Sequence, residues 1–215
     1  KKLKPYLPPK TELDTWNGTC YVSLVGFMFV NTKMLGMAIP FHRNFEEVNL
    51  RFYVRYKEGG EWKRGVVFIK EIVPKFAITF IANTFYNEHY QTLKMRHHWE
   101  VIEDKRIIRY EWKFQKQWQR FHIESQDILQ KINPGSEAEF ITEHYWGYTK
   151  ANANSSFEYG VTHPKWDVYP VTNYEIDVDF GAVYGSDFAI LNNLKPKSVM
   201  LAEGSEITVE GKKRI

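Results

Sequence analysis

Residue alternation and composition predict a mainly β chain of α+β class, in which short antiparallel strands form a barrel or a sandwich. Aromatic residues make up 16% of the 215 residues, and together with Val, Ile and Thr they favour pleated, half-buried surfaces. Apolar and polar side chains alternate with the period of a strand through most of the chain, whereas helical spacing is confined to one or two short segments. So many strands with so few helices must bury their apolar faces against one another.

The first half of the chain predicts three strands and one helix. Residues 19–30 are typical of a strand, and residues 49–56 alternate polar with apolar side chains. The Glu58-Gly59-Gly60 turn then returns the chain as a second hairpin strand at residues 65–73. Aromatic residues recur at helical spacing after the next proline, which predicts a helix over residues 75–86.

The second half continues as an antiparallel meander. The expected elements are strands at residues 93–101, 108–114, 118–124, 139–149, 157–163 and 174–180, a short helix at 187–194, and a last strand at 198–209. No repeat, low-complexity tract or long polar linker divides the chain, so we expect a single domain over residues 1–215.

Charge and cysteine content exclude several classes of partner. The 29 Lys and Arg residues nearly balance the 26 Asp and Glu residues, and a net charge of +3 cannot hold nucleic acid or an acidic membrane unaided. The apolar run at residues 20–30 is about half of the ~20 residues that a membrane helix needs. With one cysteine, Cys20, an internal disulfide is excluded. We therefore expect a cytoplasmic protein whose partner is a small molecule rather than nucleic acid or a membrane. The sequence does not predict its oligomeric state.

The common catalytic motifs are absent. The sequence contains no GxGxxG, GxxxxGK[ST], HExxH or GxSxG, so it predicts no nucleotide or metal cofactor, and it assigns no catalytic residue. The alternating acids Glu175, Asp177 and Asp179 lie roughly 6.6 Å apart along one strand face, too far to share one ion. They indicate a solvated strand face.

One predicted strand could line a binding site. Asn49, Arg51 and Tyr53 share one face, which is either an ordinary wet surface or the wall of an interior cavity. Periodicity alone favours the wet surface. If the face is interior, Arg51 requires an acidic partner or an anionic ligand, because an unpaired buried charge costs several kcal/mol. Glu143 is the candidate partner.

A second candidate cluster is aromatic. Tyr159 and His163 fall on one face of the strand expected at residues 157–163, and Trp166 follows shortly after. They suit either a partly apolar ligand or a plain core corner, and the pattern does not separate the two. His42, in a loop expected at residues 40–44, is predicted to lie at the surface.

Four short motifs resemble a known family. They are LDTWNG at residues 13–18, VNLRFYV at 48–54, FITEHY at 140–145 with Tyr148 shortly after, and HPKW at 163–166. In this order they resemble the YqjF-like family of largely uncharacterised bacterial proteins. That family is similar to the acetoacetate decarboxylase-like superfamily, which implies an antiparallel β-barrel around a hydrophobic cavity and favours an interior position for Arg51. The resemblance also implies a further stretch ahead of residue 1.

The resemblance does not carry decarboxylase activity to this chain. The decarboxylases form a Schiff base on a lysine that follows a short helix, and residues 86–91 here contain no lysine. Lys94, the nearest one downstream, falls on a polar strand face and is expected to be exposed.

The sequence therefore leaves three hypotheses. The first is a binder of a small organic ligand, with a carboxylate as one option and Arg51 as its anion contact. The second is an enzyme that acts on a keto or enol substrate by general acid–base chemistry, with Glu143 or His89 as base and Tyr86 as donor. The third is a non-catalytic structural or interaction module. The expected ligand-binding residues are Asn49, Arg51, Tyr53, Tyr86, His89, Glu143, Tyr148, His163 and Trp166.

Overall fold

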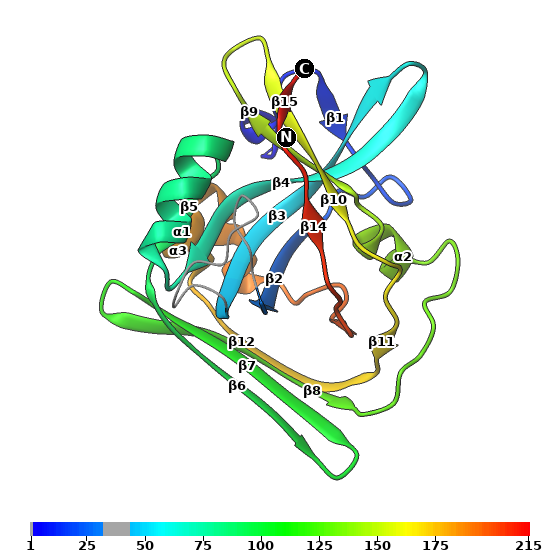
Figure 1. Cartoon of the computed structure of the whole chain (residues 1–215). Helices are drawn as coiled ribbons and strands as arrows, with labels where there is room; N and C mark the ends of the chain where they lie inside the picture. Colours follow the sequence, from blue (N-terminus) through cyan, green and yellow to red (C-terminus); the bar gives the residue numbers. More distant parts are fainter. Residues whose placement is uncertain (1, 32–43) are drawn as a thin grey trace.

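The fold is built around two β-sheets that pack face to face (Figure 1). The computed structural model describes residues 2–31 and 44–215, so His42 lies outside the described residues. The nine-stranded sheet contains β1 (Thr11–Leu13), β2 (Val22–Phe29), β3 (Phe45–Glu58), β4 (Glu61–Val73), β5 (Tyr90–Thr92), β9 (Trp146–Lys150), β10 (Ser156–Thr162), β14 (Thr208–Val209) and β15 (Lys213–Arg214).

The second sheet is a four-stranded antiparallel meander. It contains β6 (Lys94–Ile102), β7 (Lys105–Phe114), β8 (Gln117–Gln126) and β12 (Val171–Asp177), in the order β12-β8-β7-β6. The short strands β11 (Val168–Tyr169) and β13 (Leu201–Ala202) form a separate pair. The helical segments are η1 (Lys4–Tyr6), α1 (Phe76–Ile81), η2 (Ala82–Tyr86), α2 (Glu137–Thr142), α3 (Phe180–Tyr184) and η3 (Ser186–Asn193).

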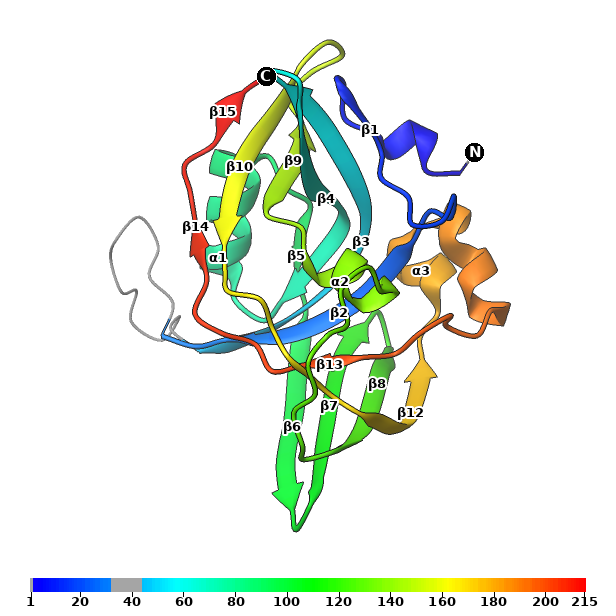
Figure 2. The same ribbon diagram turned by 90° about the vertical axis from the view of Figure 1, so that its right-hand side faces the viewer.

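The mainly β prediction is confirmed, and the closed barrel is not. The large sheet curves strongly (Figure 2), but the pairings of its described strands run from β1 to β14 without returning to the starting edge. The β3–β4 hairpin and the β6–β7–β8 meander form where the alternation predicts them. The helix expected at residues 75–86 is present as α1 followed by η2, a π-helical turn.

Three predicted elements are wrong or shortened. The strand expected at residues 139–149 begins only at β9, because residues 137–142 form α2, whose first turn is capped by the Ser136 hydroxyl accepting from the Glu139 N–H. The strand expected at 174–180 ends at Asp177, and Phe180 begins α3. The strand expected at 198–209 is reduced to β13 and β14. The helix expected at 187–194 is present as the 3-10 helix η3.

Both faces of β3 are buried, and this positions the candidate site. Leu50 and Phe52 on one face pack into the main core between the two sheets, together with Trp112 of β7 and Val183 of α3. The opposite face is turned toward the hollow side of the curved sheet, where Tyr53 packs in a smaller cluster with α2. Polar residues on that second face are therefore removed from water.

Candidate functional site

The inward face of β3 carries a row of polar side chains. Glu47, Asn49, Arg51 and Tyr53 are spaced two residues apart, so they project from the same side of the strand. Glu47, Asn49 and Tyr53 are at most 1% exposed, and Arg51 is half-buried with its guanidinium carbon 5.7 Å from the centre of the Tyr53 ring. This strand face is therefore buried and is not an ordinary wet surface.

Glu47 is the first of three buried carboxyl groups. Its Oε1 accepts from Asn49 Nδ2 at 2.9 Å, and its Oε2 accepts from the Tyr90 hydroxyl of β5 at 2.9 Å. Burial raises the pKa of Glu47 to about 7, although both hydrogen bonds and the charge of Arg51 act in the opposite direction. The group is thus close to half-protonated at neutral pH.

Glu71 is the second carboxyl group, and part of it has no partner. It lies opposite Asn49 in the β3–β4 register and beside Tyr90 in the β4–β5 register. Its Oε2 is buried without a hydrogen-bond partner among the described residues. Burial, with the charges of Glu88 and Glu47, raises the pKa of Glu71 well above its usual range. The raised pKa favours the protonated form of Glu71.

Glu88 completes the group from the segment between η2 and β5. Its Oε1 accepts from the Tyr159 hydroxyl of β10 at 2.8 Å, and burial raises the pKa of Glu88 to about 8. The Tyr159 ring packs on Gly147, where a Cβ atom would come within 2.1 Å of the ring, so only glycine allows this contact. We call Glu47, Asn49, Glu71, Glu88, Tyr90 and Tyr159 the carboxyl cluster.

A buried histidine lies on the other side of Arg51. His144, which follows α2, directs Nε2 to Asp14 Oδ2 at 3.2 Å, and its ring stacks 4.6 Å from the Tyr53 ring. Its Nδ1 is buried without a partner in the described structure. Burial lowers the pKa of His144 to about 4, so the imidazole is neutral, and the charge of Arg51 acts in the same direction. Along β3, Arg51 lies between Asn49, which contacts Glu47, and Tyr53, whose ring contacts His144.

These groups offer hydrogen bonds rather than a metal site. Among the described residues, no group of three or more His, Cys, Asp or Glu side chains is arranged to hold a metal ion. Protonated carboxyl groups and tyrosine hydroxyls can donate to a carbonyl or enolate oxygen, and an ionised carboxylate can accept a proton. Arg51 adds one positive charge.

The expected pairing of Arg51 with Glu143 is wrong. Glu143 caps the end of α2, accepts from the Tyr145 hydroxyl at 2.6 Å and lies 3.9 Å from Lys165 Nζ. Arg51 forms no ion pair with any described carboxylate, and its Nε is buried without a partner. Long-range packing of α2 directs Glu143 away from β3.

The other expected ligand-binding residues are divided among several places. Tyr86 borders the carboxyl cluster, with its ring edge-on to Tyr159 at 6.0 Å. Tyr148 is buried elsewhere and donates to Glu158 at 3.0 Å. His89 is exposed and contributes its backbone carbonyl, which accepts from the Glu71 N–H at 3.1 Å.

His163 and Trp166 form a partly exposed stack away from the carboxyl cluster. Their rings are 4.2 Å apart, and the Tyr145 ring stacks on the other side of His163 at 4.6 Å. Trp166 and Glu143 line a hollow of about 280 Å³ on the outside of α2. The predicted aromatic box is thus split, because Tyr159 turns inward to Glu88 while His163 remains near the surface.

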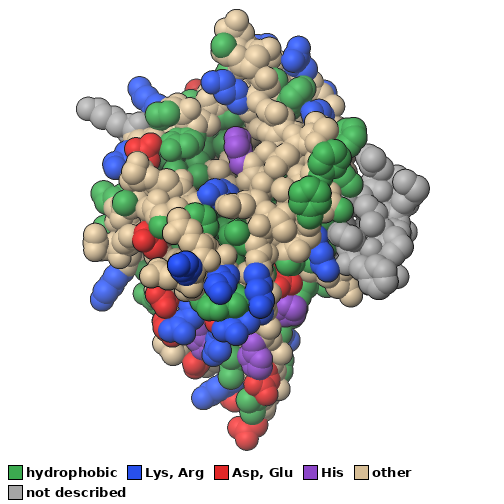
Figure 3. All heavy atoms as spheres, turned by 90° about the vertical axis from the view of Figure 1, so that its left-hand side faces the viewer, with side chains coloured by type: hydrophobic (Ala, Val, Ile, Leu, Met, Phe, Trp, Pro, Cys, Tyr) green, Lys and Arg blue, Asp and Glu red, His purple; other side chains and the backbone are tan. Residues whose placement is uncertain are grey.

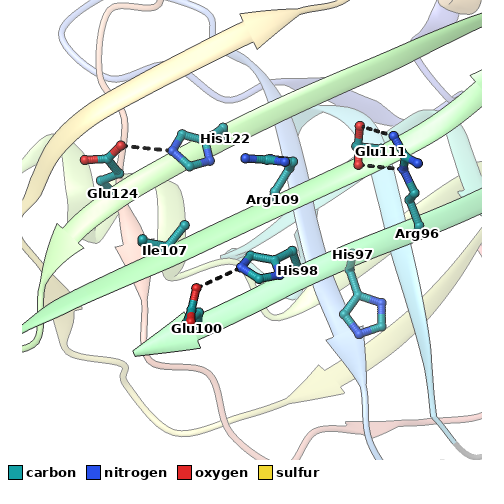
Figure 4. A pocket seen from close by; sticks show the side chains of 9 residues that line it. All are labelled: Arg96, His97, His98, Glu100, Ile107, Arg109, Glu111, His122 and Glu124. Atoms are coloured by element: carbon teal, nitrogen blue, oxygen red, sulfur yellow. Dashed lines mark hydrogen bonds and ion pairs between the residues drawn. The ribbon is translucent and has the colours of Figure 1, made fainter. Parts of the chain in front are cut away.

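An open hollow lies on the outer face of the four-stranded sheet (Figure 4). It measures about 680 Å³, and most of its polar side chains already bond one another. Those pairs are Arg96 with Glu111, His98 with Glu100 and His122 with Glu124. This hollow is open, and among its lining residues only His122 has a buried polar atom, Nδ1, without a hydrogen-bond partner in the described structure.

Sequence reasoning missed most of the carboxyl cluster. Glu47, Glu71, Glu88, Tyr90 and Tyr159 were not among the expected site residues. One signal was present. Glu71 is a charged residue within the mostly apolar run of residues 66–73, and a glutamate is rarely buried in such a run unless it has a partner. Glu47 lies two residues before Asn49 on the same strand face, so alternation could also have included it. Glu88, Tyr90 and Tyr159 come from segments that only the fold brings together.

Comparison with known proteins places the chain in a family. The model of the DUF2071 family, described as an uncharacterized conserved protein, matches residues 1–206. The curated "Uncharacterized protein YqjF" of Bacillus subtilis (strain 168) is 35% identical over 89 residues, which make up 41% of this chain. The match spans 35% of that relative's length.

Solved structures share the fold at low identity. An acetoacetate decarboxylase from Legionella pneumophila aligns with a TM-score of 0.59 and 15% identity over 99% of this chain and 79% of its own. An acetoacetate decarboxylase-like enzyme from Sphingomonas wittichii RW1 aligns with a TM-score of 0.58 and 9% identity, over 100% and 86%. Within residues 2–31 and 44–215, no helix is long and apolar enough to cross a membrane. The fold is acetoacetate decarboxylase-like, and the chain belongs to the DUF2071 family, with YqjF as a homologue.

Proposed function

We propose that the chain binds a small organic ligand bearing a carbonyl or carboxylate group on the inward face of β3. The observation that carries the proposal is a set of buried polar atoms without partners on one side of the large sheet. They are Asn49 Oδ1, Arg51 Nε, Glu71 Oε2 and His144 Nδ1. Buried polar atoms are nearly always hydrogen-bonded, so several unsatisfied ones together are typical of a site that a ligand or water completes.

The charges define which ligands fit. Arg51 is a half-buried cation of the inward face without a carboxylate partner among the described residues, and the raised pKa of Glu71 favours a protonated carboxyl group, which can donate a hydrogen bond. A carboxylate would therefore contact Arg51, and a carbonyl oxygen would accept from the carboxyl cluster. No lysine belongs to the carboxyl cluster or to the strand face that carries Arg51, so the proposed function does not involve a Schiff base.

A thermal-shift screen with short-chain carboxylic and keto acids tests this proposal. At least one acid is expected to raise the melting temperature of the wild type, because a ligand that binds only the folded state stabilises it. Arg51→Ala should lose that response. Arg55→Ala is the matched control, since Arg55 lies on the same strand and pairs with Glu12 at the surface. If the rise in melting temperature is lost in both Arg51→Ala and Arg55→Ala, or in neither of them, Arg51 is not part of the binding site.

A second candidate function is proton transfer to and from the bound ligand. It is favoured by the pKa values of Glu47 and Glu88, about 7 and 8, which suit general acid–base exchange at neutral pH. We expect the protein to accelerate deuterium exchange at carbon atoms next to the carbonyl group of a keto acid, as followed by proton NMR. Glu88→Gln should slow this exchange at least ~100-fold. Ligand stabilisation without any exchange would leave binding as the function.

A further inference from the structure

The four-stranded sheet ends in an open edge. β6 pairs with β7 on one side, and no described strand pairs with its other side. Figures 1 and 2 show the β6–β7 hairpin projecting beyond the rest of the molecule. The backbone N–H and C=O groups along such an edge are a ready template for another strand.

β6 also exposes large apolar side chains. Met95, near its start, is buried in the main core, but Trp99, Val101 and Ile102 are 51%, 52% and 48% exposed. Trp99 and Val101 are on the same face as Met95. They remain exposed because the β6–β7 hairpin extends beyond the main core. Exposed apolar residues beside an open strand edge are typical of an interaction site.

The charges of β6 identify the occupant of this edge. Arg96, His98 and Glu100 lie on the outer face, next to the basic and histidine side chains gathered toward the tip in Figure 3. A two-fold antiparallel pairing centred on His98 places Arg96 of each copy opposite Glu100 of the other. Opposite charges in directly facing positions stabilise a strand pair. The strand is thus complementary to itself.

We infer that β6 is a dimerisation strand that pairs with β6 of a second copy of this chain. The neighbouring two-fold registers are less favourable, since a centre on residue 97 places Arg96 opposite His98 and a centre on residue 99 places it opposite Ile102. Arg96 is held on the outer face by Glu111, which accepts from its Nε and Nη2 at 2.7 and 2.9 Å. In this dimer the two four-stranded sheets form one continuous sheet. Trp99 and Val101 of both copies then lie on the same face of that sheet.

Charge exchange tests the inference. Sedimentation equilibrium of the wild type is expected to show a reversible dimer, of about micromolar affinity because one strand pair makes a small interface. Arg96→Glu and Glu100→Arg should each weaken self-association about tenfold or more, since each places like charges opposite one another twice. An equimolar mixture of the two variants should restore association, because both facing pairs are then opposite in charge.

The mixture makes the test independent of folding defects, because two misfolded variants would not associate specifically. Arg109→Glu is the control: Arg109 lies one strand away on β7 and faces His98 within the same sheet, so its reversal should leave self-association unchanged. A wild type that is monomeric at about 500 μM, well above the expected affinity, overturns the inference. So does a dimer that neither reversal weakens, or variants that gain nothing when mixed.

Discussion

The free energy of unfolding is expected to fall as pH rises from 6.5 to 8.5. In an unfolded chain a glutamate releases its proton near pH 4.3, but in the folded protein Glu47 and Glu88 keep theirs until about pH 7 and 8. The folded state therefore binds more protons than the unfolded state above pH 4.3, and stability decreases with rising pH until both groups are ionised. The slope is at most about 1.4 kcal/mol per pH unit for each group, and Glu47 and Glu88 together give a loss of about 3 kcal/mol over this window. Glu71, whose pKa is also raised, acts in the same direction.

His144 sets the lower limit of the window. Its pKa is depressed to about 4, so its contribution to stability is lost as pH falls below about 6.5, which opposes the carboxyl groups there. Above about pH 7.5 the imidazole is largely neutral in both states and adds little slope. Urea denaturation at a series of pH values from about 7.5 upward therefore reports mainly on the carboxyl cluster.

The Glu88→Gln variant tests whether the carboxyl cluster causes the change of unfolding free energy with pH. A neutral amide keeps the volume of Glu88 but cannot ionise, so the variant is expected to lose less stability than the wild type between pH 6.5 and 8.5. Glu61→Gln, at the exposed start of β4, is the control and should leave the wild-type slope intact. A wild-type stability that is constant or increases with pH would show that Glu47 and Glu88 are ionised throughout.

Local patterns predicted the parts of the fold that form between neighbouring segments. The β3–β4 hairpin follows from alternation around the Glu58-Gly59-Gly60 turn, and both its strands are close in sequence. Residues 139–142 misled the same reasoning, because Phe140 and Ile141 fit a strand but pack as one face of α2 against Tyr53. The cap that starts this helix, Ser136 with Glu139, was visible in the sequence and outweighs strand propensity.

The candidate site was predictable as a strand face but not as a set of contacts. Alternation correctly grouped Asn49, Arg51 and Tyr53, because neighbours two apart on a strand must share a side. Some partners come from segments far along the chain, such as His144 beside Tyr53, whereas Glu47, which accepts from Asn49, lies on β3 itself. The expected partner Glu143 is directed elsewhere. Such choices depend on the curvature of the sheet, which residue order does not encode locally.

Two arginines that face each other across the β3–β4 hairpin should differ sharply in their contribution to stability. Arg55 and Arg64 are register partners, and each pairs with an acid from the N-terminal segment, Glu12 and Asp14 respectively. The side chain of Glu12 is 52% exposed, whereas that of Asp14 is 6% exposed. Burial raises the pKa of Asp14, but its hydrogen bonds with His144 and Arg64 outweigh that effect and hold the pKa below its usual value.

Arg64→Ala is expected to lower the free energy of unfolding by about 2 to 3 kcal/mol, because it leaves a buried carboxylate with only a neutral imidazole as partner. Arg55→Ala should cost about 0.5 kcal/mol, as exposed ion pairs do. Adding Asp14→Asn to Arg64→Ala should recover part of the loss, since the uncompensated charge is then removed, and urea denaturation of the four proteins at pH 7 measures each step. Equal losses of unfolding free energy in Arg64→Ala and Arg55→Ala would contradict this prediction. They would mean that Asp14 is solvated and that its ion pair with Arg64 does not stabilise the region around His144.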